Sequence, residues 1–220
     1  MSTTALCKIY PEPSICEREI WRYAGCKTAD NTLSDLLKDC LQEARDVLTY
    51  KVCYTERRCQ TDGDLCDFGG MRVHSKHLAS ALQGCDRVIV FAATVGTGLD
   101  RLIAKYSRLS PAKALMLQAI GTERIEALCD AFCADMASIY GMGLTPRFSP
   151  GYGDLPLDTQ RELFALLNPA KHIGLTLNDS LLMSPSKSVT AFAGIGGKIK
   201  SAPNKCSLCQ KTDCAFRGVV

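Results

Sequence analysis

The ten residues Arg147-Phe-Ser-Pro-Gly-Tyr-Gly-Asp-Leu-Pro156 constrain the fold more than any other stretch of the chain. Two prolines and two glycines in ten positions forbid a regular helix or a central strand, because proline lacks an amide hydrogen and glycine loses the most entropy when its backbone is fixed. The chain must therefore form a shaped loop here, after a long helical stretch and before the rest of the fold.

Three polar side chains of this loop could form a ligand site. Arg147, Tyr152 and Asp154 supply a guanidinium, a phenol and a carboxylate within one short segment. Such a set suits a small zwitterionic ligand, whose carboxylate would meet the guanidinium fork and whose ammonium would meet an anion or carbonyl groups. A polar surface turn with a buried Pro-Tyr anchor has the same composition, so both interpretations stay open from the loop alone.

The loop and the segments after it resemble a known family. Arg147-x-x-x-Gly151-Tyr152 is followed by three further segments: Leu163-Phe-Ala-Leu-Leu167, Ile173-Gly-Leu-Thr-Leu177 and Leu182-Met-Ser-Pro-Ser-Lys-Ser-Val189. Their order and spacing are similar to the S-adenosylmethionine-binding activation domain of cobalamin-dependent methionine synthase. A weaker similarity covers residues 86–140, and residues 1–85 resemble mainly the stand-alone bacterial versions of this domain.

The resemblance implies a set of site residues. In the family, the arginine and the loop backbone hold the methionyl part of S-adenosylmethionine, and the tyrosine lies near the cobalt face of the corrinoid. By this resemblance Arg147, Ser149, Gly151 and Tyr152 are cofactor-binding residues, and Tyr152 also takes the catalytic position. Glu126 aligns with a family glutamate that helps to bind S-adenosylmethionine, while a solvated helix glutamate is the other interpretation.

One departure from the family follows Met183–Phe192, a stretch that resembles the family's closing strand. Fused enzymes have aromatic residues there that touch the adenosine, whereas this sequence reads Ala193-Gly-Ile-Gly-Gly197. Their N-terminal carboxylate, which also meets the ligand, has no matching position here.

Hydrophobic periodicity predicts helices and mostly antiparallel strands that interleave without a regular strand–helix–strand repeat. This pattern favours an α+β fold, with one domain over residues 1–197 and a mixed, mostly antiparallel sheet. The expected helices are Leu33–Ala44 capped by Asn31 or Thr32, one through Leu82 capped by Ser75, Ser110–Tyr140 with a weak point at Gly121, and one through Leu167 capped by Asp158. The expected strands are Tyr50–Cys59, short pieces around Phe68–Val73, and Asp86–Thr94.

A glycine-containing turn, Val95-Gly-Thr-Gly-Leu-Asp100, follows a predicted strand and opens a helix. Turns in this position can hold a phosphate or a nucleoside. Arg101 stands where the third glycine of the dinucleotide-binding fingerprint would be, so that fingerprint fails. The sequence therefore favours a tight strand-to-helix turn over a ligand role.

Three of the thirteen cysteines lie close together near the C-terminal end. Residues 198–220 read as a linker and a tail in which Cys206, Cys209 and Cys214 bring three thiolates together. This spacing predicts a zinc site or an iron–sulfur cluster, with a fourth ligand from elsewhere in the fold or from a partner. The total of thirteen cysteines is odd and no export signal is present, so we expect reduced thiols or metal ligands rather than disulfides.

Charge and hydropathy exclude several classes of protein. The net charge of +3 is spread without basic blocks, which argues against a nucleic-acid partner. No stretch approaches the roughly eighteen apolar residues of a membrane span, and Met1–Tyr10 does not read as a signal peptide, so we expect a cytoplasmic protein without a membrane partner.

These observations predict a reactivation subunit for cobalamin-dependent methionine synthase. No Asp-x-His-x-x-Gly motif occurs, so the cobalamin would belong to a partner subunit. The chain would bind S-adenosylmethionine and position its methyl group for reductive methylation of cob(II)alamin, with an electron donor such as flavodoxin or ferredoxin. Two alternatives stay open: activation of a different corrinoid methyltransferase, and a non-catalytic metal or electron-transfer module in which the loop survives only as structure.

Overall fold

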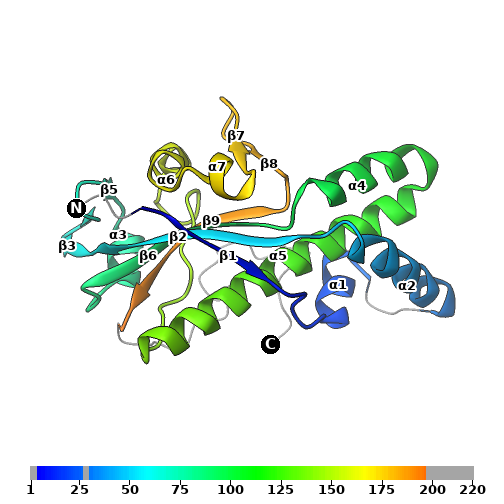
Figure 1. Cartoon of the computed structure of the whole chain (residues 1–220), viewed down its shortest axis with the longest axis horizontal. Helices are drawn as coiled ribbons and strands as arrows, with labels where there is room; N and C mark the ends of the chain where they lie inside the picture. Colours follow the sequence, from blue (N-terminus) through cyan, green and yellow to red (C-terminus); the bar gives the residue numbers. More distant parts are fainter. Residues whose placement is uncertain (1–3, 27–29, 197–220) are drawn as a thin grey trace.

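The computed structural model describes residues 4–26 and 30–196. A four-stranded antiparallel sheet in the order β1-β2-β6-β9 runs through the molecule, with α5 on one face and α6 and α7 on the other (Figure 1). Its strands are β1 (Leu6–Tyr10), β2 (Tyr50–Arg58), β6 (Arg87–Thr94) and β9 (Ser188–Ile195). The predicted α+β class is confirmed.

The remaining elements surround this sheet. The helices are α1 (Glu17–Tyr23), α2 (Asn31–Arg45), α3 (Lys76–Ala81), α4 (Thr97–Leu109), α5 (Pro111–Tyr140), α6 (Thr159–Leu167) and α7 (Pro169–Ile173). A small three-stranded sheet consists of β3 (Gln60–Asp62), β4 (Leu65–Asp67) and β5 (Arg72–His74), and a two-stranded ribbon consists of β7 (Thr176–Leu177) and β8 (Met183–Ser184). The sequence had predicted the antiparallel patch of β3 to β5, whereas β1 was not predicted.

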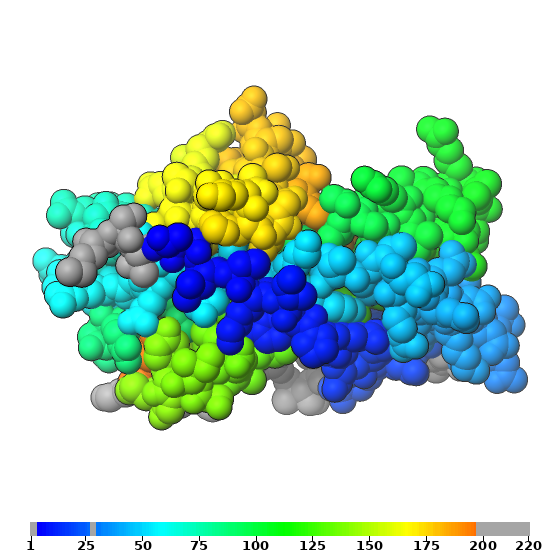
Figure 2. Space-filling view, in the orientation of Figure 1, coloured from blue at the N-terminus to red at the C-terminus, as the bar shows by residue number. Residues whose placement is uncertain are grey.

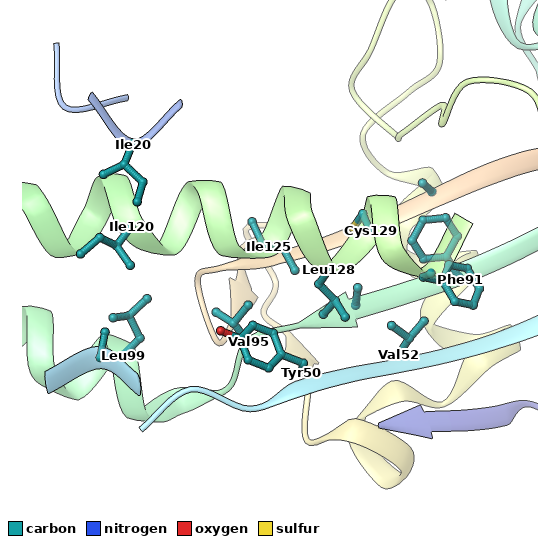
Figure 3. Packing of buried hydrophobic residues seen from close by; sticks show 14 of the residues in the cluster. Ile20, Tyr50, Val52, Phe91, Val95, Leu99, Ile120, Ile125, Leu128 and Cys129 are labelled. Carbon is teal, nitrogen blue, oxygen red and sulfur yellow. The ribbon is translucent and has the colours of Figure 1, made fainter. Parts of the chain in front are cut away.

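Both faces of the central sheet are buried, because side chains alternate along each strand. Phe91 of β6 points into the core beneath α5, whereas its neighbours Val90 and Ala92 point into a second core that includes residues of α3, α6 and α7. Figure 3 shows Ile125, Leu128 and Cys129 of α5 among the labelled residues of the first core. The sheet therefore has two hydrophobic layers, one on each face.

The thirty-residue helix α5 is the longest element. Proline at its first helical position has no amide hydrogen to leave unpaired, and Gly141 ends the helix in a left-handed conformation with φ of 60°. The helix continues through Gly121 to Tyr140, the end that the sequence predicted. A Cβ atom at Gly121 would lie 2.4 Å from Cδ2 of Leu99 and 2.9 Å from Cγ of Lys187, so the glycine lets α4 and the start of β9 approach closely.

A buried ion pair fixes the N-terminal segment on α5. Arg124 is fully buried and donates to the carbonyl oxygens of Pro13 (2.6 Å) and Ser14 (2.8 Å), and also to both carboxylate oxygens of Glu123. Glu123 in turn accepts from the amide of Cys16 at 3.0 Å. These bonds satisfy both charges and hold the chain that leads into α1.

The strand-to-helix turn before α4 is a packing turn, as the sequence favoured. Gly96 has φ of 87°, and a Cβ there would lie 2.4 Å from Oγ1 of Thr49. A Cβ at Gly98 would lie 2.4 Å from the carbonyl oxygen of Val47. The lack of a side chain at Gly96 and Gly98 thus lets the segment before β2 pack closely against this turn.

Three predicted helix caps had different outcomes. Ser75 caps α3 as expected and accepts from the amide of Leu78 at 3.0 Å. The cap of α2 is Asp30, which accepts from the amide of Leu33 at 2.8 Å, so the prediction of Asn31 or Thr32 is wrong by one or two positions. Asp158 precedes α6 but its side chain makes no capping bond and instead accepts from Nε of Arg161 at 2.9 Å.

Among the described residues, no helix combines the length and apolarity needed to cross a membrane. The predicted linker and tail at 198–220, with Cys206, Cys209 and Cys214, lie outside the described residues.

The close contact at Gly121 predicts an unusual mutational effect. Gly→Ala at an open helix position stabilises by about 1 kcal/mol. Gly121→Ala should instead lower the free energy of unfolding by about 1–3 kcal/mol, because the new methyl group overlaps Leu99. Urea unfolding measures the change, with Ser138→Ala, at an exposed position of the same helix, as a control that should not destabilise. A Gly121→Ala variant as stable as the wild type would contradict the packing role.

Candidate functional site

The loop after α5 runs along the outer edge of β9. The amide of Phe148 donates to the carbonyl of Phe192 at 2.9 Å, and the amide of Phe192 donates back at 2.8 Å. Further along, the amide of Thr145 donates to the carbonyl of Gly194 at 2.9 Å. The loop therefore pairs with β9 in place of a fifth strand and covers an edge that would otherwise expose unpaired backbone groups.

This pairing sends neighbouring side chains of the loop to opposite faces of the sheet. Phe148 is buried in the core beneath α6 and α7. Arg147 instead reaches α5, where its Nη2 atom donates to Oε2 of Glu126 at 2.8 Å and its Nη1 atom donates to the carboxylate of Asp130. The structure thus brings together two of the predicted site residues, Arg147 and Glu126.

Arg147 is held in a charged and mostly buried setting, with 15% of its side chain exposed. Burial works against its charge, but the neighbouring Cys129 thiol and the Asp130 carboxylate outweigh burial and hold the pKa of the guanidinium above its usual range. Glu126 is half-buried and Asp130 is exposed, with 34% and 72% of their side chains accessible. The cation therefore lies inside and the anions face outward.

The cluster of Glu126, Arg147 and Asp130 offers both signs of charge at one place. Two carboxylates surround one guanidinium, so the cluster carries a net negative charge, and the guanidinium has five N–H donors, of which these bonds use two. It can therefore receive a ligand ammonium and a ligand carboxylate side by side. Asp130 was missed from the sequence, although its position one helical turn after Glu126 is a signal that could have identified it.

The three other predicted loop residues form the turn that follows Arg147. Gly151 has φ of 84° and donates its amide to the carbonyl of Leu155 at 2.9 Å, while the amide of Tyr152 donates to the carbonyl of Ser149 at 3.1 Å. The ring of Tyr152 packs edge-on against Phe148 at 5.4 Å between centroids, and 45% of the residue is exposed. Within the described part of the chain, no hydrogen bond or ring contact joins Tyr152 to Arg147.

Asp154 has a different role from the one that the loop composition indicated. Its carboxylate accepts from the hydroxyl of Ser75 and from the amides of Lys76 (2.8 Å) and His77 (3.2 Å), at the start of α3. These bonds, that from Ser75 foremost, lower the pKa of Asp154. The interpretation of Asp154 as a partner of Arg147 in a ligand set is therefore corrected: it ties the loop to α3.

The lack of aromatic residues at the end of β9 has a steric reason. A Cβ atom at Gly194 would lie 2.5 Å from Sγ of Cys85 and 2.9 Å from Cδ2 of Leu82. The neighbouring Ala193 is buried in the sheet. An aromatic side chain at position 194 would displace Cys85 and Leu82.

No metal site forms among residues 4–26 and 30–196, where no three His, Cys, Asp or Glu side chains are placed to hold an ion. The ten cysteines within these ranges are free thiols. His74 and His77 lie instead beside carboxylates, at 3.3 Å from Asp64 and 3.5 Å from Asp154.

Residues 74–201 match the family model described as vitamin B12 dependent methionine synthase, activation domain. Among solved structures, the chain is similar to the crystal structure of the MetH reactivation domain bound to AdoHcy, with a TM-score of 0.68 and 16% sequence identity. The alignment covers 90% of this chain and 80% of that one, and at this identity it shows a shared fold. No curated protein matches the chain.

Asp154→Asn should destabilise the protein at neutral pH, because an amide brings no charge to the α3 amides. Folding lowers the pKa of Asp154 below its ordinary value of 3.8. Its stabilising contribution is therefore complete above that value and is lost as the pH falls through the lower folded pKa.

We expect the difference in unfolding free energy between wild type and Asp154→Asn to be constant from neutral pH down to about pH 5, and to shrink below pH 3.8. Urea unfolding across this range measures it. Asp62→Asn, at an exposed position of β3, is the matched control. Equal stability of Asp154→Asn and wild type at neutral pH would show that the carboxylate does not anchor the loop.

Proposed function

Because the chain belongs to the family of the vitamin B12 dependent methionine synthase activation domain, we propose that it binds S-adenosylmethionine beside the Arg147 loop and presents the methyl group to a cobalamin on a partner protein. The observation that carries this proposal is the cluster of Glu126, Arg147 and Asp130. The AdoHcy bound to the structurally similar MetH reactivation domain supports it as well.

The charges of the cluster suit S-adenosylmethionine. The ligand has one carboxylate, one ammonium and one sulfonium, so it carries a net positive charge, whereas the cluster is net negative. The ligand carboxylate would bind N–H groups of the Arg147 fork, and the ammonium would bind the outward-facing carboxylates. Loss of the methyl group removes the sulfonium charge, so the product would fit this cluster less well and leave.

The loop turn supplies the other contacts in this proposal. Ser149 and Gly151 would border the methionyl part of the ligand, as the family resemblance implies. Tyr152 projects from the same turn and is exposed, which leaves its ring accessible to a partner. We assign it the face turned toward the corrinoid, with a role in placing the two reactants rather than in holding S-adenosylmethionine.

The partner in this proposal is a cobalamin-bearing methionine synthase subunit. Its cofactor supplies the hard chemistry, namely reductive methylation of cob(II)alamin with one electron and the methyl group of S-adenosylmethionine. The 220 residues contain no motif for a lower histidine ligand to cobalt, which supports a cobalamin held elsewhere. An electron donor such as flavodoxin or ferredoxin completes the reaction.

Arg147→Lys tests the binding site while keeping a positive charge between Glu126 and Asp130. Lysine lacks the planar fork, so the variant should bind S-adenosylmethionine more weakly by about 2 kcal/mol, with a nearly unchanged melting temperature. Isothermal titration calorimetry measures the affinity. Arg161→Lys on α6, where arginine pairs with Asp158 on the surface, is the control and should bind like the wild type. A folded Arg147→Lys variant with wild-type affinity would remove Arg147 from the site.

We further propose that Cys206, Cys209 and Cys214 bind zinc or an iron–sulfur cluster. Thiolates this close in sequence repel one another unless they are protonated, oxidised or metal-bound, and a metal would order a tail too short to form a core. An iron–sulfur cluster near the corrinoid could also deliver the electron that reactivation needs.

Anaerobic purification of the whole chain, followed by metal analysis and a visible spectrum, tests the tail. We expect metal bound in the wild type and lost in Cys209→Ser, with visible absorption if the metal is iron. The internal Cys40→Ser variant, at a cysteine buried in the first core, should keep the metal. A metal-free wild type with three reactive tail thiols would contradict the proposal.

A further inference from the structure

A second charged site lies at the opposite edge of the central sheet from the Arg147 loop. An open cleft of about 370 Å³ lies between the start of the chain, β2 and the α6–α7 region. Figure 2 shows the first described residues, in dark blue, directly beside the yellow helices, in agreement with the contact of the Cys7 thiol with the carbonyl of His172 at 3.7 Å. Strands β6 and β9 separate β2 from the Arg147 loop.

Arg57 is the residue that makes this cleft unusual. It lies on β2 four residues beyond Cys53, whose side chain is part of the second core, so alternation turns it to the face that α6 and α7 cover. Its Nε atom is buried and has no hydrogen-bond partner within the described ranges. Buried polar groups of proteins are almost always paired, and a buried guanidinium nitrogen is costly to leave unpaired.

The other arginines with little exposure each have a carboxylate partner, which Arg57 lacks among the described residues. Arg124, fully buried, is paired with Glu123, and Arg147 is paired with Glu126 and Asp130. Arg57 has neither an ion pair nor a hydrogen bond in residues 4–26 and 30–196, and the cleft around it has no acidic side chain in its lining. Arg57 is thus a partly buried cation, and no described residue supplies an anion to pair with it.

The remaining polar groups of the cleft also suit an anion. Lys171 and His172 of α7 line it, together with the amide of Asn168 and the hydroxyl of Thr4. Neither the Lys171 nor the His172 side chain has a hydrogen bond or ion pair with a described residue. A tetrahedral oxyanion has enough acceptor oxygens to meet a guanidinium, an ammonium and an imidazole at once, whereas a single carboxylate has fewer.

We propose that this cleft binds the phosphate group of a small molecule, with Arg57 as its buried anchor and Lys171 and His172 at its mouth. A volume of about 370 Å³ admits a phosphate ester or a pyrophosphate with part of its carrier. The site is separate from the one proposed for S-adenosylmethionine, so each of the two proposals can be tested without the other.

Calorimetric titration of the whole protein with pyrophosphate and with adenosine monophosphate tests the site, with citrate as a carboxylate probe of similar charge. We expect one of the two phosphates to bind with a Kd of about 1 mM or tighter at physiological ionic strength, and more tightly than citrate. Arg57→Gln should weaken that binding at least about tenfold. Arg58→Gln, the exposed neighbour on the same strand, should bind like the wild type.

The melting temperature separates a ligand role from a structural one. Because Nε of Arg57 has no described partner to lose, Arg57→Gln should melt no lower than the wild type. Lys171→Gln, at an exposed position, gives a second test if Arg57→Gln does not fold, and it should also weaken phosphate binding. Arg147→Lys should leave phosphate binding unchanged.

Nuclear magnetic resonance supplies a local readout, since the chain has only three histidines. Pyrophosphate should shift the imidazole signals of His172 and leave those of His74 and His77 in place. The proposal would be overturned if neither phosphate bound, or if Arg57→Gln bound phosphate as tightly as the wild type. It would also be overturned if citrate bound more tightly than both phosphates.

Discussion

The outer edge of β9 is the constraint on which the candidate site depends. A strand edge has unpaired backbone groups that must be covered, and here the cover is a proline- and glycine-containing loop that cannot itself become a strand. Two bonds between Phe148 and Phe192 fix its register. That register turns Phe148 into one core and Arg147 toward α5, and the hydrogen bonds of Asp154 with Ser75, Lys76 and His77 fix the far end. Backbone pairing with β9 and the Asp154 hydrogen bonds to the start of α3 therefore hold the loop at both ends.

Three arginines of this chain illustrate how burial and pairing decide a role. Arg124 is paired with the Glu123 carboxylate and with the carbonyl oxygens of Pro13 and Ser14, so its role is structural. Arg147 shares its charge with two carboxylates that face outward, so the same ion pairs that hold the loop can also meet a zwitterion. Arg57 has no described anion, which points to one from outside. Position in the fold, rather than residue type, separates these roles.

Local patterns predicted much of the fold and part of the site. The helices of residues 33–44 and 110–140, the strands now seen as β2 and β6, and the Ser75 cap all follow from periodicity and capping rules. Contacts between residues far apart in the sequence decided the rest. Strand β1 is short and largely exposed, so its own pattern gave no signal. Leu99 leaves no room for a side chain at Gly121, and Asp154 accepts a hydrogen bond from Ser75 at the start of α3. The family resemblance named Glu126 and Arg147 as candidates, and the structure pairs them, while Asp130 needed the geometry of the helix.

We propose that this chain presents the methyl group of S-adenosylmethionine to cobalamin on another protein. The most direct measurement mixes the purified chain with a cob(II)alamin-bearing methionine synthase subunit that lacks an activation domain, a low-potential reductant, and S-adenosylmethionine with a deuterated methyl group. Absorbance follows methylcobalamin, and mass spectrometry reads its label. We predict labelled methylcobalamin, with one S-adenosylhomocysteine formed per methyl group, only when the chain is present. Methylcobalamin formation at the same rate without the chain would contradict the claim.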